Sequence, residues 1–68
     1  MNVAQERIEQ TKEAIAEAER FVYAARRHIG RLIKEPDSVY CSKEGGAMKR
    51  ASMDLSRSLV PLRRSPHA

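Results

Sequence analysis

The sequence predicts an all-α protein: a helical hairpin made of a long helix, a short loop and a shorter helix. Three observations predict this class. Apolar residues recur every seven positions in two separate segments, a spacing typical of helices that pack against other helices. A proline lies between the two segments, and a chain of 68 residues has room for one domain, residues 1–68.

The first helix is expected over about residues 3–34, because this segment has no proline, one glycine and many good helix formers. Asn2 is expected to be its N-cap. Two rows of period seven, offset by three residues, have the spacing of a coiled-coil seam. The β-branched row is Ile8, Ile15, Val22 and Ile29, and the mostly small row is Ala4, Thr11, Ala18, Ala25 and Leu32.

Pro36 is expected to end this helix, since the residue before a proline avoids the α region. A loop over residues 35–42 follows, and Ser42 is the expected N-cap of a second helix over about residues 44–60. The pair Gly45-Gly46 is a poor helix interior, so the start could be delayed to about Ala47. Pro61 is expected to kink or end the helix, with a frayed tail over residues 61–68. The inward rows are Met48, Leu55 and Leu62, and Ser52 and Leu59.

The unequal lengths of the two helices predict a homodimer. At about 1.5 Å per residue the first helix is about 48 Å long and the second about 20–25 Å, so the second covers only the C-terminal half of the first. The apolar seam continues into the uncovered half, where a second copy can cover it. The expected dimer interface is Ala4, Ile8, Thr11, Ile15, Ala18 and Val22.

The charges of the first helix suggest how two copies pair. Five glutamates lie within residues 1–19, whereas residues 20–34 hold five basic residues and no acid. An antiparallel pair of long helices sets acidic halves against basic halves, and a parallel pair sets like against like. We therefore expect an antiparallel four-helix arrangement of two hairpins. The alternative is a monomeric hairpin whose overhang is solvated.

The sequence gives little support for catalysis. Cys41 is a candidate nucleophile and His28 a candidate base, but they fall in different elements and no third group orients them. With one cysteine and two histidines, we expect no metal site and no other cofactor. The chain has no apolar run of about 20 residues and no signal-peptide pattern at its start. We therefore expect a non-enzymatic cytoplasmic protein without a membrane span.

Two charge patterns leave alternatives open. A net charge of +4 and basic clusters on both helices permit a nucleic-acid-binding dimer, although only three aromatic residues are present for base stacking. On the first helix, an acidic stripe either keeps the surface soluble or binds a basic partner such as a DNA-binding domain. The stripe is Glu6, Glu9, Glu13 and Glu17.

The hairpin tip is the first candidate for partner binding. Asp37, Ser38 and Tyr40 place a charge, a hydroxyl and an aromatic on one short loop, and tyrosine is favoured in binding hot spots. The alternative is that Asp37 and Ser38 only form a turn while Tyr40 covers the core. A basic patch at Arg26 and Arg27 is the second candidate.

In its length, its long first helix, the connection EPDSVYCS and the second-helix segment AMKRASMDLSRSL, the chain resembles the very short helical-hairpin proteins of Mu-like Pseudomonas bacteriophages. The resemblance covers the whole chain and implies a dimeric inhibitor, an anti-activator of quorum sensing. It implies two host partners: the DNA-binding domain of a LuxR-type activator and the assembly ATPase of the type IV pilus. A DNA mimic would be acidic, whereas this chain is basic, so the resemblance implies inhibition through local contacts.

Overall fold

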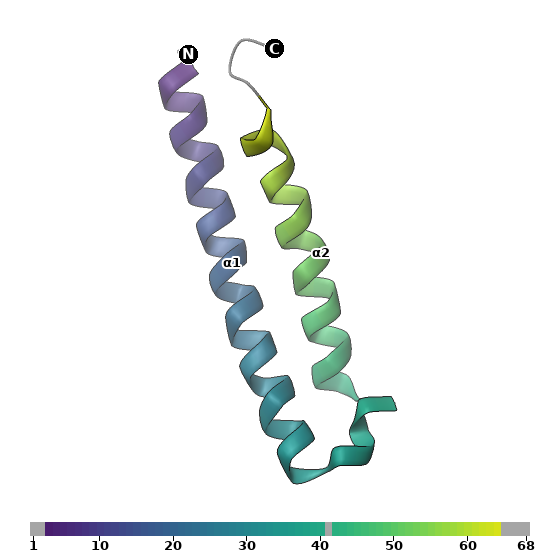
Figure 1. The fold of residues 1–68 in the computed structure, drawn as a ribbon. Helices are drawn as coiled ribbons and strands as arrows, with labels where there is room; N and C mark the ends of the chain where they lie inside the picture. The colour runs from purple at the N-terminus through teal and green to yellow at the C-terminus, as the bar shows by residue number, and fades with distance from the viewer. Residues whose placement is uncertain (1–2, 41, 65–68) are drawn as a thin grey trace.

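The computed structural model describes residues 3–40 and 42–64, and it confirms the all-α hairpin (Figure 1). Helix α1 (Val3–Lys34) is followed by a short 3₁₀ helix, η1 (Pro36–Tyr40), and by helix α2 (Lys43–Arg63). The two α-helices run antiparallel and lie side by side along their length (Figure 1). The hairpin is a thin rod with extents of 49 × 17 × 13 Å, so nearly every residue lies close to the surface.

The bounds of α1 agree with those predicted from the sequence. Glu6 lies in the first turn, and Arg31 and Lys34 lie in the last, so these charges oppose the helix dipole at each end. The helix ends two residues before Pro36, as expected. The predicted N-cap, Asn2, lies outside the described residues.

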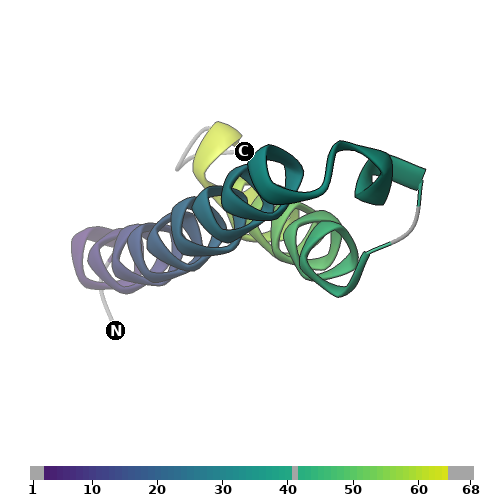
Figure 2. The ribbon, with the colours of Figure 1, turned by 90° about the horizontal axis from the view of Figure 1, so that it is seen from below.

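The connection contains a 3₁₀ helix where the sequence predicted a loop. Pro36 occupies the first position of η1, where its missing backbone donor costs nothing. The turn is joined to α1 by two backbone hydrogen bonds: Glu35 N–H donates to the Arg31 carbonyl at 2.8 Å, and Ser38 N–H donates to the Glu35 carbonyl at 2.9 Å. Seen from below, this segment projects to one side of the helix pair (Figure 2).

Helix α2 begins with the predicted cap, and earlier than Ala47. The Ser42 hydroxyl accepts a hydrogen bond from the Gly45 N–H at 2.9 Å, which is the N-cap geometry. The cap holds the two glycines in the first turn, so the helix starts at Lys43. Gly45 also allows a close approach, because a Cβ atom there would lie 3.1 Å from His28 Cε1.

The predicted end of α2 at residue 60 is wrong, because the helix passes through Pro61 and ends at Arg63. Pro61 removes one backbone donor, but it does so in the last turn, where the carbonyl groups have another source of hydrogen bonds. The Arg7 guanidinium donates to the Pro61 carbonyl at 2.9 Å and to the Arg64 carbonyl at 2.8 Å. A cation from α1 therefore caps the C-terminus of α2. The part of the predicted tail beyond Arg64 lies outside the described residues.

The extra turn of α2 overturns the predicted overhang. Since Arg7 reaches the end of α2, the second helix covers α1 nearly to its start. An uncovered N-terminal half of α1 therefore cannot be the reason for a dimer.

The face of α1 that packs on α2 also differs from the predicted seam. Ala14 on α1 and Ala51 on α2 are the buried hydrophobic residues of the described chain, at 6% and 5% exposure. Three residues of the predicted small row are half-buried as expected, namely Ala18, Ala25 and Leu32. The row of Ala14 is half-buried as well, at Arg7, Phe21 and His28. Small alanines on both helices allow close approach, so this row faces α2 and the β-branched row, one residue later, turns outward. On α2 the predicted inward residues are half-buried, namely Met48, Ser52, Leu55, Leu59 and Leu62.

Candidate interaction surfaces

The β-branched row of α1 forms an exposed apolar surface, which we call the isoleucine face (Ile8, Ile15, Val22 and Ile29). These side chains are 44–56% exposed. A helix has 3.6 residues per turn, so the row lies about 100° around α1 from the row of Ala14 that packs on α2. The isoleucine face is therefore continuous with one edge of the interhelical boundary and is not covered by α2.

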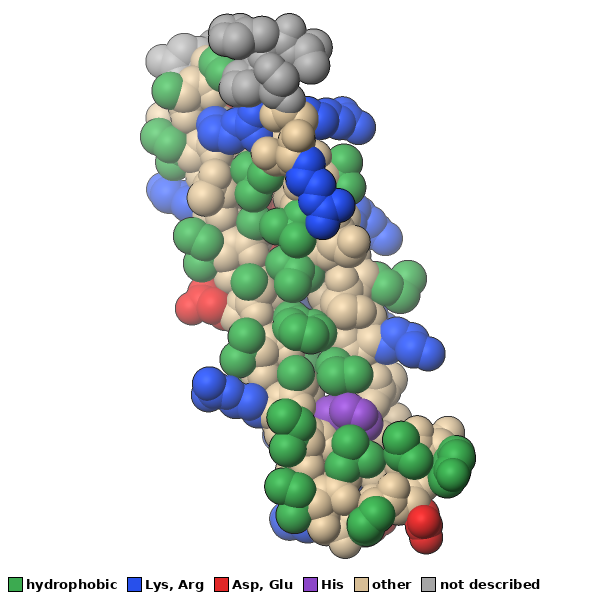
Figure 3. Space-filling view, viewed as in Figure 1, with side chains coloured by type: hydrophobic (Ala, Val, Ile, Leu, Met, Phe, Trp, Pro, Cys, Tyr) green, Lys and Arg blue, Asp and Glu red, His purple; other side chains and the backbone are tan. Residues whose placement is uncertain are grey.

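Hydrophobic side chains extend from this boundary along the length of the hairpin. Figure 3 shows them in green between and beside the two helices, with lysine and arginine at the edges and few acids. The accessible surface of 5557 Å² exceeds the roughly 4,300 Å² expected for a compact protein of this mass. The excess of about 1,200 Å² is larger than the ~800 Å² that each partner buries in a standard interface.

The other side of the interhelical boundary is hollowed into a cavity of about 280 Å³, which we call the arginine groove. Alanines from both helices form much of its lining, and charged residues and one tyrosine surround them. The lining residues are Arg20, Tyr23, Ala24 and Arg27 from α1, and Glu44, Ala47, Arg50, Ala51 and Asp54 from α2.

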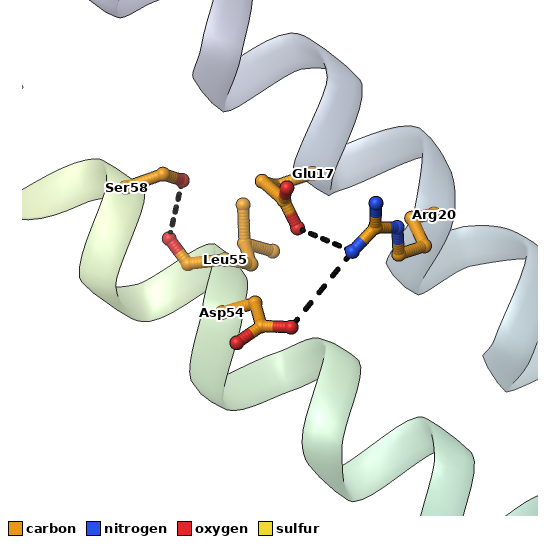
Figure 4. Close-up of polar contacts among 5 residues, drawn as sticks. All are labelled: Glu17, Arg20, Asp54, Leu55 and Ser58. Carbon is orange, nitrogen blue, oxygen red and sulfur yellow. Dashed lines mark hydrogen bonds and ion pairs between the residues drawn. The ribbon is translucent and has the colours of Figure 1, made fainter.

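The two acids of the groove are each paired with an arginine of α1. The Arg20 guanidinium lies 3.9 Å from the Asp54 carboxylate and 3.5 Å from that of Glu17, so it links the two helices (Figure 4). The Arg31 guanidinium lies 4.0 Å from the Glu44 carboxylate. Arg31 lies closer to the Glu35 carboxylate, at 3.2 Å, so both arginines are shared between an acid of the groove and a second acid.

The remaining two arginines of the groove have no carboxylate partner in the described part of the chain. The Arg27 guanidinium lies over the Tyr23 ring, 5.7 Å from its centroid, and donates to the tyrosine hydroxyl at 3.4 Å. This cation–π contact fixes the cation without neutralising it. Arg50 lies across the groove on α2 and makes no ion pair with another described residue.

The predicted tip residues have different environments. Tyr40 is 89% exposed and the adjacent Val39 is also exposed, so Tyr40 does not cover the core. Asp37 is exposed, but Ser38 is 8% exposed and its hydroxyl has no hydrogen-bond partner within the described residues. Ser38 is therefore less accessible to a partner than Asp37 and Tyr40, and its expected role in partner binding stays a prediction.

Neighbouring residues on a helix point about 100° apart, so residues close in sequence do not always share a surface. The structure separates members of two predicted groups, the basic patch and the acidic stripe. Arg27 lines the arginine groove and Arg26 does not, so the two arginines do not form one patch. Glu17 leaves the predicted acidic stripe, because its side chain is 19% exposed and lies at the helix boundary beside Arg20. Glu6, Glu9 and Glu13 are exposed.

The candidate base, His28, lies at the closed end of the hairpin. It lines a cavity of about 330 Å³ together with Tyr40, Gly45 and Met48. Its Nδ1 atom is buried and has no hydrogen-bond partner within residues 3–40 and 42–64. The candidate nucleophile, Cys41, lies outside the described residues, so the pair is not placed by the structure.

Sequence reasoning missed the arginine groove and the Arg7 cap. The groove joins residues of both helices, so no local spacing marks it; the sequence signal was the i, i+4 pair of Tyr23 and Arg27. Arg7 meets Pro61 across 54 residues.

Comparison with protein-family models, with curated proteins and with solved structures found no match to this chain. Neither described α-helix is apolar enough over a sufficient length to cross a membrane. Within the same residues, histidine, cysteine and acidic side chains do not gather in a group of three or more that could hold a metal ion.

Proposed function

We propose that this chain is a non-enzymatic protein-interaction module that works as a homodimer and inhibits a host protein by occupying its surface. The observation that carries the proposal is the uncovered isoleucine face on a hairpin that buries only two small apolar side chains among its described residues. Water penalises such a surface, and burying it against another protein removes the penalty.

The first occupant we propose for the isoleucine face is a second copy. The row of four residues is centred between Ile15 and Val22, so a two-fold axis there sets each row against its own image. An antiparallel pairing also sets the acidic start of one α1 against the basic end of the other.

The hairpin tip supports partner binding on the dimer. Tyr40 and Val39 are exposed at the closed end, away from the open end where Arg7 caps α2. Tyrosine is one of the residue types enriched in binding hot spots. We propose that this tip contacts the target. The resemblance to the phage hairpin proteins favours the DNA-binding domain of a LuxR-type activator as the target, with a pilus assembly ATPase second.

Light scattering tests the dimer. The chain should have twice the mass of 7.7 kDa, and Ile15→Glu should return it to a single mass because a buried carboxylate opposes association. Ala16→Glu is the matched control, since it places the same charge on an exposed neighbouring position outside the isoleucine face. A single mass for the unmodified chain at all concentrations would overturn the dimer.

Titration with a purified DNA-binding domain of a LuxR-type activator tests the target. The chain should bind the domain, and the bound domain should no longer retard operator DNA in a gel mobility-shift experiment. Tyr40→Ala should weaken this binding about tenfold, a change typical of a hot-spot residue, and leave helicity and dimer mass unchanged. Met53→Ala removes an exposed large side chain of α2 outside the tip and should have little effect. Equal loss in both variants, or no binding at all, would contradict the proposed target surface.

A further inference from the structure

We infer that the arginine groove is a second binding surface, and that its ligand is an acidic segment of a partner protein. The segment places an aliphatic side chain on the alanine lining and carboxylates at Arg27 and Arg50. This inference rests on the proposed function, because it assigns a partner chemistry to a surface of the same interaction module. It adds a partner of opposite charge to the basic DNA-binding domain.

The lining of the groove fits an aliphatic side chain. Ala24 comes from α1, and Ala47 and Ala51 come from α2, so the groove is shallow and apolar where the helices approach. A cavity of about 280 Å³ is large enough for one or two side chains and too small for an extended ligand. Ligand sites commonly combine such an apolar lining with a few polar groups that fix orientation.

The charges of the groove leave a net attraction for carboxylates. The lining carries three arginines against two acids. Asp54 lies 3.9 Å from Arg20, and Glu44 lies 4.0 Å from Arg31, although each of these arginines also pairs with a second acid. Arg27 and Arg50 stand on opposite helices without carboxylate partners in the described residues. Two guanidinium groups on either side of an apolar lining match a segment with an aliphatic residue between acids.

The Arg27 guanidinium is held in place before a ligand binds. Its contact with the Tyr23 ring, at 5.7 Å, orients the guanidinium, which donates one hydrogen bond to the tyrosine hydroxyl and keeps its other donors available. A guanidinium that is already fixed loses less conformational entropy when it binds a carboxylate. Tyrosine and arginine are also the residue types that dominate binding hot spots.

The surroundings favour an acidic protein segment over nucleic acid. The groove continues along the hairpin into a hollow lined by Glu13, Glu17 and Asp54, with Arg57 and two uncharged residues. A phosphate backbone that followed the hairpin toward its open end would meet these carboxylates after leaving the arginines. Toward the tip it would meet a hollow in which Arg31 and Lys34 lie beside Glu35 and Glu44. A short acidic segment ends before it reaches these carboxylates.

The groove stays accessible when the isoleucine face is covered. Arg27 and Ile29 are two residues apart, so their side chains point about 160° apart around α1. A second copy on the isoleucine face therefore leaves the arginine groove on the outside of the dimer.

Fluorescence anisotropy with synthetic peptides tests the inference. The probe is a labelled helical peptide with leucines on one face and glutamates beside them, and the comparison probes are the same peptide with lysines for glutamates and a short DNA duplex. The glutamate peptide should bind, and Arg27→Glu and Arg50→Glu should each weaken it about tenfold. Ala47→Phe should weaken it by filling the groove without a change of charge.

Arg57→Glu is the matched control, because Arg57 is an exposed arginine of α2 outside the groove; its effect should stay within about twofold. Absence of binding by the glutamate peptide, or equal losses at Arg50 and Arg57, would overturn the inference. Binding of the duplex alone, lost in Arg27→Glu, would overturn it in favour of nucleic acid. Light scattering and the titration with the DNA-binding domain do not depend on the groove, so they report separately on the proposed function.

Discussion

The two sides of the interhelical boundary differ in what they leave exposed. On one side the isoleucine face is apolar along much of α1, and no residue of α2 covers it. On the other side the arginine groove balances most of its charges internally and leaves two cations without acids. An apolar surface can be buried against any complementary apolar surface, including the same surface of a second copy. Unpaired cations instead favour a partner that carries acidic groups. The proposed dimer and the proposed acidic partner therefore use opposite sides of one thin hairpin.

The largest expected effect concerns the pairing on the isoleucine face. In a Cys41→Ser background, Ile8→Cys and Ile29→Cys lie at opposite ends of the row. An antiparallel dimer brings Ile8 of one copy near Ile29 of the other, so a mixture of the two variants should form a mixed disulfide rapidly. Each variant alone should cross-link slowly, because a disulfide requires Cα atoms about 4.4–6.8 Å apart.

The cross-linked products are separated by non-reducing gel electrophoresis, with a size tag on one variant. A parallel dimer predicts the reverse pattern, in which each variant cross-links with itself. Arg27→Cys lies on the groove side and serves as the control that should not cross-link in either arrangement.

The next effect concerns the packing between α1 and α2, which positions both the isoleucine face and the arginine groove. Ala14 is buried against α2, so Ala14→Leu should push the helices apart and destabilise the hairpin by about 1–3 kcal/mol. Both the dimer and peptide binding in the groove should weaken together. Ala16→Leu adds the same side chain at an exposed position of α1 and should leave urea unfolding nearly unchanged. Equal stability of the two variants would show that Ala14 does not determine the helix spacing.

The residues that could be predicted are those whose signal is local. Pro36 and Ser42 act on their own segments, and both predictions are confirmed. The face of α1 that turns inward was not predictable in the same way, because two rows of period seven lie one residue apart. The row that faces α2 contains the polar residues Arg7 and His28, so the sequence does not mark it as inward. It faces α2 because Ala14, in the same row, lets the two helices approach closely. The dimer interface itself stays a prediction, although the reason for it has changed from an overhang to an exposed face.

The smallest effect concerns the open end, where Arg7 joins α1 to the C-terminus of α2. Arg7→Ala removes two hydrogen bonds from a guanidinium to helix carbonyls, at 2.9 and 2.8 Å. Part of this site is exposed, so we expect a loss of about 1 kcal/mol and faster amide exchange confined to the last turn of α2. Lys12→Ala removes an exposed cation of α1 without such contacts and should not change exchange there. Because the arginine groove and the centre of the isoleucine face lie more than a turn from this end, peptide binding and dimer mass should persist in Arg7→Ala. Loss of either function would mean that the two sides are coupled through the length of α2, and that the separation between them is incomplete.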